Sequence, residues 1–328
     1  MRDVVPMMEA YLPLMKASAM VTAGELGVFH HLHRGPATAE DAAHALGAHA
    51  GGMRALLDGL AAFGLLTRNG AHYANTPFVR DHFTPAAKAD FTPGLLWTAE
   101  ARRLMHGLTD AVRLGGPTVS MWEQMKAHPR MGELFSRYMA AFARYFSDDV
   151  QASVELPPGA RRLLDVGGAH GLHSVAFCRR YPALTSVVFD FPDSLHATAA
   201  VLAEQDLSDR ITLRPGDAVA DELGTGFDAV LLLSVLHNQD ATQTRTLLHK
   251  AFRALEPGGL LVIHEHFQGQ QDPLPFASAF MLTLLVEVGT SLHDYATLQA
   301  ALREAGFTRT ERRDLHPLEK GSIILAWK

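Results

Sequence analysis

The second half of the sequence alternates short apolar runs with helical segments, and this alternation restricts the fold more than any other feature. It begins after Pro157-Pro158-Gly159, which interrupt the preceding helical pattern. Repeated strand–helix units predict an α/β fold with an open, mainly parallel sheet and helices on both faces. Such sheets bind ligands at the carboxyl ends of their strands. The predicted strands are RLLDVGG, which runs into a glycine-rich turn, then TSVVFDFP, ITLRPGD, FDAVLLLSVLH, GGLLVIHEHF and SIILAWK, of which the last is expected to be reversed.

The first part of the chain reads as mainly helical. Three helical segments are followed by TRNGAHYANT, in which Asn69-Gly70 is a hairpin turn signal, and together they predict a winged-helix layout. Thr38 is the expected N-cap of the second segment. Two longer helical stretches are predicted at about 93–113 and 131–154. We therefore expect a helical domain over residues 1–155 and an α/β domain over residues 156–328.

Composition and charge narrow the class of protein. The net charge of −6 argues against a main role in neutralising phosphates, and the single cysteine excludes an internal disulfide framework. No apolar run reaches the roughly 18 residues of a membrane span. The histidine clusters HHLH (30–33) and HEH (264–266) lack a third ligand at a familiar spacing, so no metal is expected. We expect a soluble, cytoplasmic protein without a membrane partner.

A glycine-rich turn directly follows the first predicted strand, in the order Asp165-Val166-Gly167-Gly168-Ala169. Glycines let the backbone approach a ligand closely, and the helix that follows offers free N–H groups. Asp190 ends the next strand 23 residues beyond Gly167, a distance suited to holding a ribose diol. Asp217 ends the third strand. The nicotinamide fingerprint GxGxxG is absent, since residues 167–172 read GGAHGL.

The stretch SVLHNQD (234–240) ends the fourth predicted strand with His237. This histidine has two readings: a general base at the rim of the sheet, or a strand-end side chain bonded to backbone. Histidine suits proton transfer near neutral pH, which favours the first reading if the site around it is functional.

Taken together, these motifs resemble the class I S-adenosylmethionine-dependent O-methyltransferases of the caffeic acid and acetylserotonin type, including their bacterial secondary-metabolism relatives. The resemblance covers nearly the whole chain. It rests on AGELGVFHHL, TAEDAAHALG and HPRMGELFSRYMAAF in the first half, and on LLDVGGAHG, VVFDFP, LLSVLHNQD and ALEPGGLLVIHEHF in the second.

The resemblance implies a homodimer formed through the helical N-terminal domain, S-adenosylmethionine as cofactor and a small, aromatic or polyketide-like acceptor. It implies that His237 deprotonates the acceptor hydroxyl, that Glu265 orients it, and that a second acidic partner falls at His293 or Asp294, of which Asp294 is the acid. The implied cofactor contacts are Asp165, Gly167, Gly168, Asp190, Asp217, Ala218 and Ser234, and the implied acceptor contacts are Met105, Phe142, Phe280 and Met281.

Departures from the family pattern leave alternatives open. Asn238 and Gln239 replace the aspartate and tryptophan that usually follow the histidine, and Leu233-Ser234 replaces the Lys or Ser–Arg that commonly precedes it. The same fold and cofactor could serve decarboxylation, hydroxylation, cyclisation, or N- or C-methylation. A DNA-binding regulator is the remote alternative. Its recognition helix, GGMRALLDGLAAFGLL, would offer only Arg54 and Asp58 as charged groups, so no nucleic acid partner is expected.

Overall fold

The computed structural model describes residues 5–203, 205–269, 276–315 and 320–328. The chain forms two compact units. The first comprises residues 1–103 and 137–145, and the second comprises residues 104–136 and 146–328. The predicted sequence boundary near residue 155 stays a prediction.

The second unit is built on a seven-stranded sheet with the order β6-β5-β4-β7-β8-β10-β9. The first five strands in this order are parallel, while β10 runs antiparallel to both β8 and β9. The predicted α/β class and the reversed last strand are therefore confirmed. The strands are β4 (Arg162–Val166), β5 (Thr185–Asp190), β6 (Ile211–Pro215), β7 (Phe227–Leu233), β8 (Leu255–Glu265), β9 (Arg309–Asp314) and β10 (Ser322–Trp327).

Strand β9 was not predicted, because its sequence RTERRD carries no apolar side chain. It lies at the edge of the sheet, where charged residues are common because they discourage pairing with another chain. Neighbouring charges of β9 pair with each other, as in the contact of Arg313 with Glu311 at 2.7 Å. Pairing with β10, rather than an apolar pattern, holds this strand in place.

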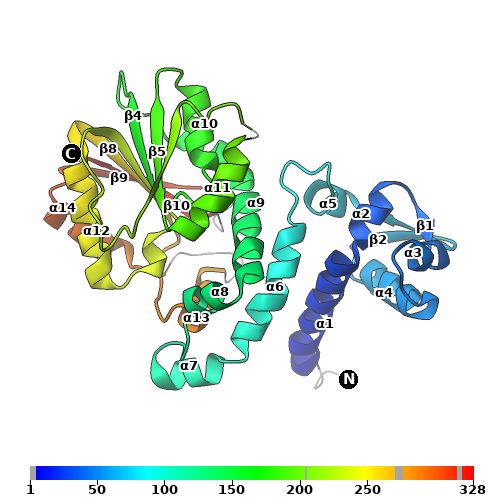
Figure 1. Ribbon diagram of the computed structural model, residues 1–328. Helices are drawn as coiled ribbons and strands as arrows, with labels where there is room; N and C mark the ends of the chain where they lie inside the picture. Colours follow the sequence, from blue (N-terminus) through cyan, green and yellow to red (C-terminus); the bar gives the residue numbers. More distant parts are fainter. Residues whose placement is uncertain (1–4, 204, 270–275, 316–319) are drawn as a thin grey trace. The chain divides into compact units, whose positions relative to one another are not determined.

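Helices cover both faces of the sheet (Figure 1). Helices α12 (Ala241–Ala254) and α14 (Tyr295–Ala305) lie on one face, and α10 (Leu172–Arg180) and α11 (Pro192–Ala203) lie on the other. Each face has its own apolar core, with Leu247 and Leu298 in one and Val175 and Leu195 in the other. Successive side chains of a strand point to opposite faces, so one strand can contribute to both cores.

The second unit contains three further helices, two before β4 in the sequence and one after β8. They are α7 (Leu108–Leu114), α8 (Met121–Ala127) and α13 (Phe276–Glu287). A Cβ added to Gly116, beyond α7, would lie 3.1 Å from the Cα of Gly289, beyond α13. The loop after α7 therefore approaches the end of α13 so closely that any side chain at position 116 would force a shift.

The first unit contains helices and a small antiparallel sheet with the order β1-β3-β2. Its elements are α1 (Val5–Leu26), α2 (Val28–His33), β1 (Ala37–Thr38), α3 (Ala39–Ala45), α4 (Ala50–Ala62), β2 (Leu66–Asn69), β3 (His72–Asn75) and α5 (Pro77–His82). Thr38 caps α3 as predicted, since its side chain accepts a hydrogen bond from the Asp41 N–H. The hairpin turn is also confirmed, with Gly70 at φ +61°.

Two helical predictions need correction at their ends. The stretch predicted at 93–113 is two helices, α6 (Thr92–Met105) and α7, which are separated at His106-Gly107. The first predicted helix is likewise divided, because Gly27 adopts φ +76° between α1 and α2. The second long stretch is α9 (Pro129–Ser153), close to its predicted range.

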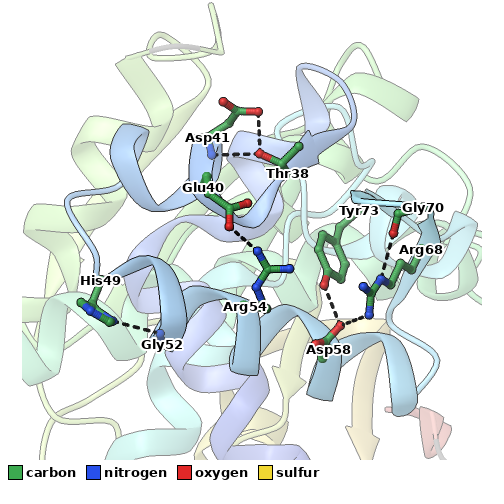
Figure 2. A network of polar contacts seen from close by, with 10 residues as sticks. All are labelled: Thr38, Glu40, Asp41, His49, Gly52, Arg54, Asp58, Arg68, Gly70 and Tyr73. Atoms are coloured by element: carbon green, nitrogen blue, oxygen red, sulfur yellow. Dashed lines mark hydrogen bonds and ion pairs between the residues drawn. The ribbon is translucent and has the colours of Figure 1, made fainter.

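The charged side chains on α4 are paired within the first unit (Figure 2). Arg54 forms an ion pair with Glu40 of α3. Asp58 accepts hydrogen bonds from Arg68 at 2.7 Å and from the Tyr73 hydroxyl at 2.6 Å. These contacts connect α4 to α3 and to the small sheet. Arg54 and Asp58 are therefore paired within this unit.

Candidate active site

The predicted site residues of the second unit gather at one edge of the large sheet. Asp165 lies near the end of β4, Asp190 ends β5, Asp217 follows β6, Ser234 follows β7 and Glu265 ends β8. These five strands are parallel, so their carboxyl ends meet at the same edge. The sheet thus brings together residues that are up to 100 positions apart in the sequence.

The glycine turn after β4 is packed too closely for side chains. Gly167 has φ +67°, its N–H donates to the Phe189 carbonyl at 2.8 Å, and an added Cβ would lie 2.7 Å from Val235 Cγ2. A Cβ on Gly168 would lie 2.7 Å from the carboxyl carbon of Asp165. Ala169 adopts φ +39°, a conformation that non-glycine residues rarely hold outside functional sites.

Asp165 lies beneath this turn and is almost fully buried. It accepts a hydrogen bond from the Ser174 hydroxyl at 2.7 Å, and burial raises its pKa to about 6. These contacts join the turn to the first part of α10. A direct contact of Asp165 with the cofactor stays a prediction.

Asp190 faces the turn from the end of β5. Its two carboxylate oxygens accept hydrogen bonds from the N–H groups of Ala169 at 2.8 Å and Phe191 at 2.7 Å, and burial raises its pKa. A carboxylate offers about four acceptor positions, so Asp190 retains capacity for ligand hydroxyls. Its partly exposed position fits the predicted contact with a ribose diol.

The loop after β6 is closed on itself and fastened to α12. Asp217 accepts from the Val219 N–H at 2.8 Å. The buried Lys250 ammonium donates to the carbonyls of Val219 at 2.6 Å, Asp221 at 2.7 Å and Ala218 at 3.3 Å. Three donors on one buried charge therefore fix the backbone of the loop that carries two predicted cofactor contacts.

His237 lies in a short 3-10 turn (η2, Leu236–Asn238) and pairs with Glu265. Its Nδ1 is 2.7 Å from Glu265 Oε2, while Glu265 Oε1 accepts from the N–H groups of Leu236 at 2.7 Å and His237 at 3.3 Å. The two residues are 9% and 2% exposed. Glu265 thus holds both the ring and the backbone of the turn.

The proton arrangement of the pair follows from its electrostatics. Burial alone would raise the pKa of Glu265, but the charge of His237 and the hydrogen bond from it outweigh burial and hold that pKa below its usual value. The carboxylate is therefore ionised and must accept, so Nδ1 of the ring donates to it. In the neutral ring Nε2 then has a free lone pair and can accept a proton.

The turn is also held from the opposite side by residues between α13 and α14. The Thr290 hydroxyl donates to the His237 carbonyl at 2.6 Å, and His293 Nε2 lies 2.8 Å from the Leu236 carbonyl. Asp294, the predicted second acid, is exposed and caps α14 by accepting from the Thr297 N–H at 2.9 Å. Of the two candidates, His293 contacts the turn, and a catalytic role for Asp294 stays a prediction.

A further buried carboxyl, besides Asp165 and Glu265, was missed from the sequence. Glu287 ends α13 and is 7% exposed, and burial raises its pKa to about 7, opposed by the charge of His237. Phe280, one of the predicted acceptor contacts, lies on the same helix with its ring 5.3 Å from the His237 ring. The one signal in the sequence was an acid within the apolar run LTLLVEV.

The remaining predicted acceptor contacts lie in different parts of the chain. Met281 follows Phe280 on α13 and is partly buried. Met105 is the last residue of α6. Phe142 belongs to the first unit, where its ring packs edge-on against Tyr138 at 4.9 Å. Contact of these three side chains with an acceptor stays a prediction.

His264 and Ser234 complete the sheet edge. Burial lowers the pKa of His264, whose Nε2 lies 2.7 Å from the Lys320 carbonyl and whose Nδ1 lies 3.2 Å from the Ser234 hydroxyl. Both ring nitrogens are thus engaged by protein groups. Ser234 adopts φ +59°, a second strained position at this edge.

No three His, Cys, Asp or Glu side chains among the described residues are arranged to hold a metal ion. No helix among them has the length and apolar character needed to cross a bilayer.

Comparisons with known proteins agree with this geometry. Residues 104–308 match a family model described as an O-methyltransferase domain, and residues 8–84 match an O-methyltransferase dimerisation domain. The chain is 31% identical over 301 residues to 3-hydroxy-5-methyl-1-naphthoate 3-O-methyltransferase of Streptomyces sahachiroi, covering 89% of this chain and 86% of that enzyme. It is 26% identical over 314 residues to acetylserotonin O-methyltransferase of Gallus gallus, covering 90% of each.

A solved structure shares the fold. Human N-acetylserotonin methyltransferase in complex with S-adenosylmethionine superimposes with a TM-score of 0.88 at 22% identity, covering 100% of this chain and 98% of that chain.

Proposed function

Because the chain belongs to the O-methyltransferase family of the acetylserotonin and caffeic acid type, as its motifs indicated, we propose that it methylates a hydroxyl of a small aromatic molecule with His237 as the general base. The family assignment makes S-adenosylmethionine the cofactor. The acceptor and the roles of individual residues are our proposal.

The observation that carries the proposal is the His237–Glu265 pair. Glu265 fixes the proton on Nδ1, so Nε2 can accept the proton of an acceptor hydroxyl. The imidazolium that forms is stabilised by the buried carboxylate at 2.7 Å. General-base catalysis of this kind typically contributes about 10²–10⁴-fold to the rate. When bound, the cofactor supplies an electrophilic methyl group, which the deprotonated oxygen takes while the carbon–sulfur bond breaks.

The turn and loops around the sheet edge fit the cofactor. The tightly packed Gly167 and Gly168 keep side chains out of the turn after β4. Asp190 has remaining acceptor positions for a ribose diol, and the Asp217–Ala218 backbone is held rigid by Lys250. Ser234, at a strained backbone position, completes the proposed set of contacts. We propose that Asp165 supports the turn from below.

An aromatic acceptor is supported by the residues beside the base. Phe280 presents its ring to His237, and Phe276 stacks on Phe280 with 5.7 Å between ring centroids. Aromatic and methionine side chains favour flat organic ligands. The relative from Streptomyces sahachiroi is named for a hydroxynaphthoate acceptor, which has this character.

We further propose that the protein works as a homodimer in the cytoplasm. The match to a dimerisation domain over residues 8–84 supports the dimer. Helix α1 exposes several large apolar side chains along its length, as expected for a surface that a second copy covers. They include Met7, Tyr11, Leu12, Leu14 and Met15.

The test combines cofactor binding with product analysis. Calorimetric titration with S-adenosylmethionine and S-adenosylhomocysteine should give binding that Asp190→Ala weakens strongly. Turnover with hydroxynaphthoates should form S-adenosylhomocysteine and a methyl ether in equal amounts, and His237→Ala should lower the rate at least 100-fold without changing S-adenosylhomocysteine affinity. Full activity of His237→Ala would exclude the base role. S-adenosylhomocysteine formed without a methylated product would exclude methyl transfer to the acceptor.

A further inference from the structure

Glu287 lies on the same face of α13 as a residue that contacts the proposed base. Phe280 and Glu287 are seven positions apart, so two helical turns place both side chains on one face. The Phe280 ring is 5.3 Å from the His237 ring. Three residues beyond Glu287, the Thr290 hydroxyl bonds the His237 carbonyl at 2.6 Å. Contacts to His237 therefore flank Glu287 on both sides in the sequence.

The two buried carboxyls near His237 differ in their hydrogen bonds. Glu265 receives three N–H groups. Glu287 is 7% exposed, yet no described residue donates a hydrogen bond to it, and the charge of His237 is the one opposing influence on its pKa. Its oxygen atoms are not among the fully enclosed, unpaired polar atoms of the described residues. With no hydrogen bond from a described residue, they therefore keep some exposure to solvent.

A buried carboxyl without a partner is costly, and the cost is removed when a ligand supplies the missing donor. Carboxylate oxygens accept hydrogen bonds, so the complementary group on a ligand is a hydroxyl or an amino group. The ligand that comes this close to His237 is the acceptor. The helix face that presents Phe280 to an aromatic ring presents Glu287 to that ring's substituents.

We propose that Glu287 binds a second hydrogen-bond donor of the acceptor, adjacent to the hydroxyl that His237 deprotonates. This inference rests on the proposed function and specifies the substrate class: aromatic molecules with neighbouring hydroxyls, or with an amino group beside the hydroxyl. Sites built to hydrogen-bond such a group discriminate strongly against analogues that lack it, because the protein group is then left unpaired.

The test is a comparison of matched probes bound to the protein saturated with S-adenosylhomocysteine. The probes are 2,3-dihydroxynaphthalene, 3-amino-2-naphthol and 2-naphthol, which differ only at the carbon beside one hydroxyl. Wild-type protein should bind at least one of the first two ten or more times as tightly as 2-naphthol. In Glu287→Leu this preference should disappear, so that the three probes bind with about equal affinity. Glu287→Gln keeps an acceptor oxygen without the charge, so it should retain the preference for a hydroxyl and for an amino group, which is uncharged on an aromatic ring near neutral pH.

Glu304→Leu, at an exposed position of α14, is the matched control and should bind all probes as the wild type does. An unchanged affinity for S-adenosylhomocysteine shows that each variant is folded. Equal or undetectable binding of the three probes to wild-type protein overturns the assignment, as does a preference that persists in Glu287→Leu. If Glu287 acted only by orienting His237, its variants would lower turnover of every acceptor alike and leave the binding preference intact.

This readout separates the inference from the proposed function, because binding needs no methyl transfer. A binding preference that depends on Glu287, without methylation of any probe, would refute the proposed function and keep the assignment. Methylation that depends on His237, without such a binding preference, would support the proposed function and refute the assignment of Glu287.

Discussion

Replacing Glu287 with leucine should make the protein more stable, and the gain should depend on pH. Burial raises the pKa of Glu287 from 4.5 to about 7, so the folded state keeps a proton that the unfolded state has already released in this range. Stability therefore falls as pH rises from 4.5 to about 7. A pKa increase of this size lowers the free energy of unfolding by about 3 kcal/mol at pH 7.5. The loss reaches its full size above the pKa of the folded state. Leucine at this position does not titrate and removes the loss.

Scanning calorimetry of the ligand-free protein at pH 5.0 and 7.5, at one protein concentration, measures this difference. A change of about 3 kcal/mol corresponds to a difference in Tm of roughly 6–12 °C for a unit of 150–250 residues. Glu287→Leu should melt above the wild type at pH 7.5, and the gap should shrink at pH 5.0. Glu287→Gln, which also does not titrate, should follow the leucine variant. Parallel pH profiles of wild type and Glu287→Leu would show that Glu287 has a donor in the free protein and would refute the reasoning.

Three further changes test other parts of the site. Glu265→Gln removes the ionised partner of His237 and should lower kcat about 100-fold. The affinity for S-adenosylhomocysteine, measured by calorimetry, should not change. If cofactor binding is lost instead, Glu265 acts in binding the cofactor. Lys250→Met removes three hydrogen bonds to the 217–221 loop and should weaken S-adenosylhomocysteine binding about tenfold, whereas Lys126→Met on exposed α8 should have no effect. Leu12→Glu should yield monomers in light scattering after size-exclusion chromatography, and an intact dimer would exclude α1 from the interface.

The parts of the site that sequence analysis predicted depend on local signals. A glycine turn directly after a strand, and acids at the ends of successive strands, need only the strand assignments to be placed at one edge. Asp190 and Asp217 reached their positions in this way. The Glu265 spacing from His237 was suggested by family resemblance, and the structure joins the two side chains at 2.7 Å.

The features that were missed depend on how distant elements pack. Glu287 is buried and Asp294 is exposed because of how α13 and the segment after it pack, and no local pattern encodes that placement. Asp294 reads equally well as an active-site acid and as a helix cap, and the structure uses it as a cap. Strand β9 was missed because its charges resemble those of a loop, and only its partner β10 makes it a strand.

The position of β10 has a consequence for how the chain folds during synthesis. β10 lies between β8 and β9, yet it is made after both. Until Ser322–Trp327 emerges from the ribosome, the edge of β8 that β10 will cover has unpaired backbone groups, and β9 has no strand to pair with. Open edges of this kind attract other chains. The strand that carries Glu265 therefore has an edge open to aggregation until β10 is made, and the sheet is completed by insertion of β10 between two strands made earlier.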